Sequence, residues 1–248
     1  MNFFEQIIYL IKEYYDVFLS GLGITLLLAI CGTIFGLIIG MFLALGRNLT
    51  CNKNDNTFIK IIKIITSKLC LVYIEVFRGT PMMVQALIIF FGGYTLGIEW
   101  NPIVCGLIII TLNTAAYMAE IVRSGINSVD LGQIEASRSL GMSHFKTMLY
   151  VVWPQALRNA LPTIANELIV NIKDSSVLNI ITVSELFMAG QIAATTYMTV
   201  ASYTIVALIY LILTLLCSFL LKLIEKKMDK DTVIAGRKLK MKVVTYDD

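Results

Sequence analysis

The sequence predicts an all-α membrane protein with five transmembrane helices. Of its 248 residues, 57% are hydrophobic and only 15% are charged, and the mean hydropathy is +0.78. Soluble domains carry about 25% charged residues. Several segments also reach the roughly 20 apolar residues that cross about 30 Å of hydrocarbon. Lys and Arg are concentrated in alternate connections, as in multi-pass membrane proteins.

The first predicted span covers residues 18–45, which contain no charged side chain. A secretory signal peptide has an apolar core of only about 7–15 residues, so we expect this segment to be a retained span. Within it, Gly32, Gly36 and Gly40 recur at every fourth position. This pattern is typical of closely packed membrane helices, and we expect the packing to lie within one subunit.

The other four spans are predicted at about 64–97, 103–125, 156–181 and 200–222. Pro81 lacks a backbone donor and crowds the preceding turn, so we expect a break near Arg78–Pro81. The fourth span is interrupted by Lys173 and Asp174. Irregular backbone at membrane depth is tolerated only where protein or a wet cavity surrounds it. The two interruptions therefore predict helices that line a cavity.

The distribution of basic residues predicts the orientation. Connections 46–63 and 126–155 and the segment after Leu221 carry Lys and Arg, whereas 98–102 and 182–199 carry none. The positive-inside rule then places the C-terminus in the cytoplasm. With five spans, the N-terminus lies outside.

A polar segment between the third and fourth spans predicts a helical hairpin. Asp130, followed three residues later by Gln133, forms a capping box that opens a short helix. Gly141 is a natural C-terminal cap, and Ser143 can cap a second helix that ends before Pro154. Such a hairpin can fill a groove of a cytoplasmic partner. On composition alone, an interfacial amphipathic loop is the alternative.

This hairpin, within residues 127–155, resembles the EAA loop of the membrane subunits of ABC importers. That loop has the pattern E-A-A, three residues, G, nine residues and I-x-L-P, and the chain keeps this spacing from Glu135 through Gly141 to Pro154. Four segments in order are similar to permeases for polar amino acids: YIEVFRGTPMMVQ, NTAAYMAEIVRSGI, GQIEASRSLG and PTIANELIVNIKDSSV. The resemblance covers residues 18–226 and implies a type I ABC importer-like fold.

The resemblance implies a permease subunit that moves a polar amino acid into the cell by alternating access. A coupling helix at about 131–141 would sit in a cleft of a cytoplasmic ATPase. Its coupling residues would be Gln133, Glu135, Ala136, Ser137 and Gly141. The chain has no G-x-x-x-x-G-K-[ST] motif, so it is not expected to be an enzyme. ATP and Mg would be used by the separate ATPase subunit.

The same resemblance implies the partners and the location. We expect an ABC ATPase dimer, a second permease chain (identical or paralogous), an extracytoplasmic amino-acid-binding protein and membrane lipid, but no nucleic acid. The expected location is the bacterial cell membrane. The chain has one His and five Cys without paired spacing, which does not favour a metal site. Residues 1–228 form the permease domain, and the basic tail 229–248 is expected to be poorly ordered.

Ionisable residues inside spans are costly and therefore indicate function. At 1.5 Å per residue, Glu167 lies about 18 Å into the fourth span and Asn113 about 15 Å into the third from its outer end. We expect Glu167 to bind the substrate's ammonium or cationic side chain and Asn113 to supply hydrogen bonds, with Gln85 as a weaker candidate. The alternatives are an ion pair of Glu167 with Lys173 or Arg78, and a helix–helix hydrogen bond for Asn113.

Six residues are assigned to gating or pore structure: Arg78, Pro81, Glu120, Arg123, Lys173 and Asp174. Glu120 and Arg123 are spaced i, i+3 near the cytoplasmic end, so they are expected to neutralise each other or to gate. Lys173 and Asp174 are expected to make the irregular turn that lets the fourth span line the path.

One alternative within the same importer class remains open, and two other classes are disfavoured. The importer can serve another small polar solute, such as an opine or a sulfur amino acid derivative. An ion-gradient-driven secondary transporter would normally show inverted repeats and more spans. A membrane-embedded enzyme would need a catalytic constellation, such as H-E-x-x-H, that the sequence lacks.

Overall fold

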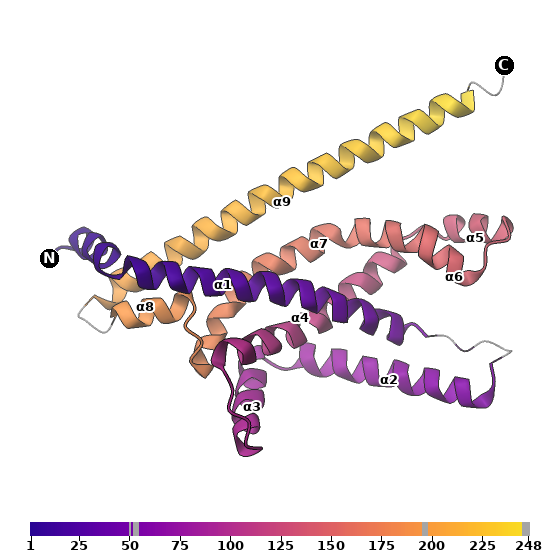
Figure 1. Cartoon of the computed structure of the whole chain (residues 1–248). Helices are drawn as coiled ribbons and strands as arrows, with labels where there is room; N and C mark the ends of the chain where they lie inside the picture. Colours follow the sequence, from indigo (N-terminus) through magenta and orange to yellow (C-terminus); the bar gives the residue numbers. More distant parts are fainter. Residues whose placement is uncertain (50, 52–54, 195–197, 245–248) are drawn as a thin grey trace.

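The computed structural model describes residues 1–49, 51, 55–194 and 198–244, with side chains through Lys226. Within these residues all regular structure is helical (Figure 1). The elements are α1 (Phe3–Arg47), α2 (Thr57–Gly79), α3 (Met82–Thr95), α4 (Pro102–Asn127), α5 (Leu131–Ser139), α6 (His144–Thr147), a π-helical turn (Met148–Val152), α7 (Trp153–Asp174), a 3₁₀ segment (Ser175–Ile181), α8 (Leu186–Ala194) and α9 (Thr199–Val244).

Three of the described helices, α1, α4 and α9, are long and apolar enough to cross a membrane. A fourth candidate is His144–Ile181 taken together with α8, two pieces bent by 54°. Helix α2 carries five charged side chains, Lys60, Lys63, Lys68, Glu75 and Arg78, which lower its hydropathy. Length and composition therefore support three or four of the five predicted spans.

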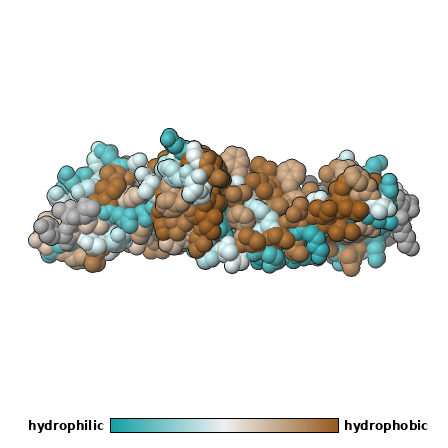
Figure 2. Space-filling model, turned by 90° about the horizontal axis from the view of Figure 1, so that it is seen from below, coloured by the Kyte–Doolittle hydropathy of each residue, from teal (hydrophilic) through white to brown (hydrophobic). Residues whose placement is uncertain are grey.

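The helices lie alongside one another with two distinct ends (Figure 1). The N-terminus and α8 lie at one end, whereas α5, α6, the start of α2 and the far end of α9 lie at the other. Helix α3 projects to one side, and α9 extends away from the other helices. Hydrophobic side chains are exposed over much of one long face (Figure 2). An exposed apolar surface of this extent suits lipid or another subunit.

The seam between α1 and α4 is set by glycines. A Cβ atom at three α1 positions would lie 2.6–2.7 Å from an α4 side chain: Gly32 from Ile110, Gly36 from Thr114 and Gly40 from Met118. No real Cβ atom packs that closely, so the absence of side chains determines how near the two helices approach. The predicted packing within one subunit is confirmed.

A buried amide joins α7 to this seam. Asn171, which is 3% exposed, accepts a hydrogen bond from Thr114 Oγ1 (3.0 Å). Its Nδ2 donates to Thr33 Oγ1 (2.8 Å), and Thr33 donates in turn to Ala29 O (2.6 Å). A buried polar network whose members all have partners specifies one arrangement of its helices. Here it holds α1, α4 and α7 together at one point.

Both predicted helix interruptions are present. Helix α2 ends at Gly79, and Pro81 precedes the first residue of α3. The Gln85 side chain bridges this break, because its Nε2 donates to the carbonyls of Phe77 and Thr80 at 2.9 Å each. In the fourth span, the α-helix changes to a 3₁₀ helix after Asp174. Two carbonyls at the first break thus have a partner despite the missing proline donor.

The predicted end of a helix before Pro154 is wrong. The chain continues from α6 through the π-helical turn Met148–Val152 into α7, with Pro154 in the first turn of α7. A π turn changes which backbone groups pair, and such local adjustments accommodate a proline within a membrane helix. The hairpin is therefore joined rigidly to α7.

Three further boundaries differ from the prediction. Helix α1 begins at Phe3, not near residue 18, with a kink at Tyr14 (φ −117°, ψ 18°). The connection 182–199 contains α8, which is too short to register as a span and buries Leu186, Ala189 and Ala193. Helix α9 continues beyond the predicted end of the fifth span at 222, as far as Val244, and the expected poor order of the tail stays a prediction. Tail residues 245–248 lie outside the described residues.

The glycine seam predicts unequal effects of two alanine substitutions in α1. Gly40→Ala should lower stability by about 1–3 kcal/mol, because its Cβ would meet backbone atoms of α4 that cannot move aside. Gly23→Ala is the matched control, since nothing lies within 4 Å of a Cβ there. Thermal unfolding of the detergent-solubilised protein measures both. Equal melting temperatures for the two variants would contradict the role given to the seam.

Candidate functional site

A cavity of about 550 Å³ lies where the α2–α3 break faces α4 and α7. Five residues that the sequence singled out line it: Arg78, Pro81, Asn113, Glu167 and Asp174. Tyr117 also lines it and was not predicted. The two helix interruptions supply parts of the wall, as expected for broken helices in a membrane protein. Cavities of about 300–1,000 Å³ are the usual size for small-molecule sites.

Glu167 is the half-buried carboxylate of this cavity. Among the described residues it forms no ion pair and no hydrogen bond, so the ion pair with Lys173 or Arg78 is not formed. Lys173 is exposed and does not line the cavity, whereas Asp174 does. A partly buried charge without a partner is costly unless water or a ligand reaches it. The cavity provides that access.

Asn113 and Gln85 form a buried pair. Asn113 Nδ2 donates to Gln85 Oε1 at 3.0 Å, and each residue is 8% exposed. The helix–helix hydrogen bond that was the alternative for Asn113 is therefore present, although Asn113 also lines the cavity. Gln85 does not line it. Through its bonds to the carbonyls of the α2–α3 break, Gln85 holds Asn113 in position.

Glu120 is the centre of an ion-pair network at the α5 end of the bundle. It pairs with Arg123, as its spacing predicted, and also with Arg47 of α1 (2.5 Å). The Arg47 carbonyl accepts a hydrogen bond from Ser67 Oγ of α2 at 2.8 Å. The network joins the end of α1 to the middle of α2 and to the last third of α4. Sequence reasoning missed the role of Arg47, because its partner is 73 residues away.

Glu185 is a fully buried carboxylate that the sequence analysis missed. Glu185 accepts hydrogen bonds from the backbone N–H groups of Phe187 (2.8 Å) and Met188 (2.9 Å). It also accepts one from the Tyr210 hydroxyl at 2.8 Å. These bonds cap α8 and connect it to α9. Glu185 is thus a structural residue. The sequence signal that could have indicated this helix start is Ser184-Glu185 directly before an apolar run.

The polar hairpin has part of the capping geometry that the sequence predicted: Asp130 caps α5, but the described residues form no capping box with Gln133. Asp130 accepts a hydrogen bond from the Gly132 backbone N–H at 2.7 Å and opens α5. Gly141 has φ +79°, its N–H bonds to Arg138 O (2.9 Å), and the next N–H bonds to Ser137 O (3.2 Å). These two bonds define a Schellman motif, which ends a helix and reverses the chain.

The predicted coupling residues divide into two groups. Gln133, Glu135 and Ala136 are exposed, whereas Ser137 is 5% exposed and donates to Thr147 Oγ1 at 3.1 Å. Ser137 therefore holds the two sides of the hairpin together and offers no surface to a partner. Three large apolar side chains are exposed around the hairpin: Leu131 (72%), Leu140 (84%) and Phe145 (72%). Exposed apolar groups of this kind typically mark an interaction surface.

Comparison with known proteins identifies the family. Residues 60–230 match the family described as binding-protein-dependent transport system inner membrane component. The chain belongs to this family. The predicted resemblance to ABC importer permeases is confirmed, and so is the predicted location in a bacterial cell membrane.

Several curated relatives cover nearly the whole chain. The putative glutamine transport system permease protein GlnP of Rickettsia conorii is 37% identical over 224 residues, which is 89% of this chain and 97% of the relative. The arginine transport system permease protein ArtQ of Bacillus subtilis is 37% identical over 212 residues, covering 85% of this chain and 91% of ArtQ. Escherichia coli GlnP is 35% identical over 216 residues, with 85% and 92% covered.

Solved structures share the fold. A crystal structure of an amino acid ABC transporter with histidines has a TM-score of 0.79 and 38% identity, covering 92% of this chain and 99% of that chain. The inward-facing MetNI methionine ABC transporter has a TM-score of 0.70 at 19% identity, with 86% and 96% covered. Because its sequence identity is only 19%, the similarity to the MetNI transporter supports the fold alone.

The hairpin geometry predicts a difference between two substitutions at Gly141. Nothing lies within 4 Å of a Cβ there, so the only cost of a side chain is the positive φ. Gly141→Asn should be tolerated, since Asn visits this region, whereas Gly141→Val should destabilise the turn by about 1–2 kcal/mol. Protease sensitivity of the 131–147 segment, measured on the inserted protein, compares them. Equal sensitivity of the two variants would contradict a φ-based requirement.

Proposed function

We propose that this chain is a transmembrane permease subunit of an ATP-driven importer that moves a polar amino acid into the cell by alternating access. The observation that carries the substrate class is the cavity between α4 and α7, which contains the Asn113 amide and the Glu167 carboxylate, the latter without an ion pair or hydrogen bond to the described part of the chain. An amino acid brings an ammonium that a carboxylate can neutralise. The relatives named for glutamine and arginine transport support the same class.

In the proposed topology the chain crosses the membrane five times: by α1, by α2 with α3, by α4, by α7 with its 3₁₀ continuation and by α9. The N-terminus lies outside and α5 lies in the cytoplasm. The opposite positions of the N-terminus and α5 support this arrangement (Figure 1). The basic connections at the α5 end agree with the positive-inside rule.

The exposed surface of α5 is the proposed docking site for a cytoplasmic ABC ATPase. Because α6 passes without a loop into α7, a displacement of the hairpin is transmitted to the helix that carries Glu167. ATP and Mg act in the ATPase dimer, and this chain catalyses no reaction. A second permease chain and an extracytoplasmic binding protein complete the importer.

The test of the function is ATP-dependent uptake in proteoliposomes that contain this chain, its ATPase and its binding protein. The panel comprises basic, neutral polar, acidic and sulfur-containing amino acids. Uptake of one charge class supports the proposal and names the substrate. ATP hydrolysis without uptake of any amino acid would discard the amino-acid assignment in favour of another small polar solute, such as an opine.

Glu167→Gln is expected to reduce uptake by about tenfold or more, because it removes a charge that binds the substrate ammonium. Assembly with the ATPase should remain intact, since Glu167 contacts no described residue through a hydrogen bond or ion pair. Glu99→Gln is the matched control, since Glu99 is exposed between α3 and α4. A parallel loss of uptake and assembly in the Glu167 variant would assign it a structural role.

A further inference from the structure

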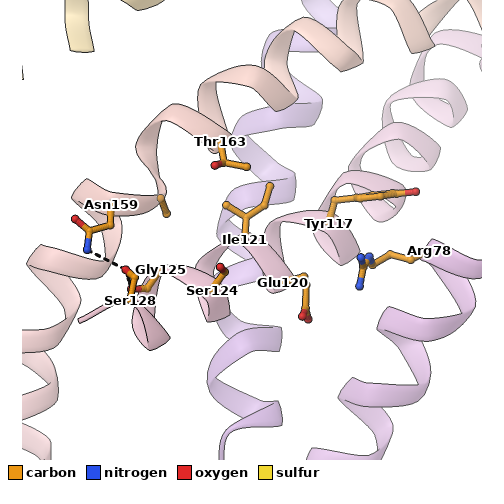
Figure 3. A pocket seen from close by; sticks show the side chains of 10 residues that line it. Arg78, Tyr117, Glu120, Ile121, Ser124, Gly125, Ser128, Asn159 and Thr163 are labelled. Carbon is orange, nitrogen blue, oxygen red and sulfur yellow. Dashed lines mark hydrogen bonds between the residues drawn. The ribbon is translucent and has the colours of Figure 1, made fainter. Parts of the chain in front are cut away.

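A second cavity, of about 400 Å³, is lined by residues of α4 and α7 that lie nearer to α5 in the chain than those of the first cavity. Figure 3 shows its lining side chains. Its polar lining consists mainly of uncharged groups: Ser124, Ser128, Asn159 and Thr163. Asn159 Nδ2 donates to Ser128 Oγ at 2.9 Å, which joins α7 to the C-terminal cap of α4 in the lining of this cavity.

The two cavities follow the same faces of the same two helices. On α7, Thr163 of the second cavity lies four residues before Glu167 of the first. On α4, Asn113 of the first cavity lies four residues before Tyr117, and Ser124 lies seven residues beyond Tyr117. Residues three, four or seven apart share a helix face. The cavities therefore form two chambers of one polar track.

Two residues line both chambers, Arg78 and Tyr117. The Arg78 guanidinium carbon lies 5.7 Å from the centre of the Tyr117 ring, which is the geometry of a cation–π contact. Figure 3 shows the two side chains reaching toward each other from α2 and α4. This stacked pair stands at the boundary between the chambers.

We propose that Arg78 stacked on Tyr117 is a gate, and that the chamber beyond it is a second, weaker site through which the amino acid passes before release. This inference rests on the proposed function, which makes the first chamber the substrate site and places α5 in the cytoplasm. The gate would separate a charged chamber from one that binds mainly by hydrogen bonds.

The difference in charge between the chambers supports the direction of passage. The first chamber contains Glu167 and Asp174, and Glu167 forms no ion pair or hydrogen bond with any residue that the structure describes. In the second, the Glu120 carboxylate is already paired with Arg47 and Arg123. A zwitterion therefore meets an available carboxylate in the first chamber and hydroxyl and amide groups in the second. Transport requires binding that is weak enough for release, and the second chamber meets that requirement.

The position of Arg78 in the chain allows such a gate to move. Arg78 lies in the last turn of α2, directly before the break that separates α2 from α3. Nothing lies within 4 Å of a Cβ at the adjacent Gly79, so there is open space on that side of the helix end. A single cation–π contact is modest in strength and can break and re-form in each cycle.

Cysteine accessibility in the complete importer tests the gate without relying on transport. The five native cysteines are first replaced, and Ser124→Cys or Val170→Cys then introduces one thiol in the second or the first chamber. A membrane-impermeant thiol reagent is applied from the cytoplasmic side without nucleotide. The thiol at position 124 should react about tenfold faster than the one at position 170. The stacked pair keeps the gate closed and so shields the first chamber from the reagent.

Changing the gate should remove this difference. Tyr117→Ala should bring the two labelling rates to within about twofold, because the ring that Arg78 stacks on is lost. Tyr117→Phe is the matched control, since it keeps the ring and should keep the difference. Arg78→Gln provides a second route to the open gate if Tyr117→Ala does not assemble.

Equal labelling of positions 124 and 170 with Tyr117 intact would overturn the gate, as would an unchanged difference in both Tyr117→Ala and Arg78→Gln. Failure of the proposed function has a separate signature, which is the absence of amino-acid uptake by the unmodified importer. An importer that transports amino acids but shows no labelling difference would therefore refute the gate alone.

Discussion

The close approach of α1 and α4 is the constraint on which the rest of this structure depends. Without a strong hydrophobic driving force between helices in lipid, close packing of small residues and buried hydrogen bonds must hold the bundle. Gly36 and its equivalents along α1 allow that approach. Thr33 and Thr114 lie at the same seam, and together they fix the Asn171 amide. The position of α7, and therefore of the cavity, follows from this contact.

The cavity in turn depends on two helices that are not continuous. A regular helix satisfies all of its backbone groups internally and offers only side chains to a solute. At Pro81 and after Asp174 the backbone departs from α-helical geometry, and both places line the cavity. Gln85 compensates for one of these breaks and at the same time positions Asn113. The same side chain, Gln85, thus satisfies backbone carbonyls at the break and holds a polar group in the cavity lining.

The α5–α6 hairpin, at the end of the bundle opposite the N-terminus, is held by local bonds and does not depend on the contact between α1 and α4. Its shape comes from local bonds, chiefly the Asp130 cap and the Schellman motif at Gly141. Its exposed side chains, including Leu140 and Phe145, contribute little to the stability of this chain. A hairpin that is rigid by itself and directly continuous with α7 can receive a force at its surface and pass it to the cavity. That combination is what a coupling element requires.

Features that arise from local chain chemistry could be predicted from the sequence. The apolar segments, the break at Pro81, the irregular turn at Asp174 and the reversal at Gly141 each depend on a few neighbouring residues. The family resemblance rested on such local segments, and the comparisons confirmed it. The function of the individual cavity residues, including Glu167, stays a prediction.

The combination of groups that are distant in the chain became visible only in the folded bundle. It paired Arg47 with Glu120, turned Ser137 inward, made Gln85 a support for Asn113 and stacked Arg78 on Tyr117. It also continued the chain through Pro154, where local rules predicted a helix end. The physical reason is that these outcomes depend on which helix faces are brought together. That choice is made by packing along the whole bundle, which no short stretch of sequence encodes.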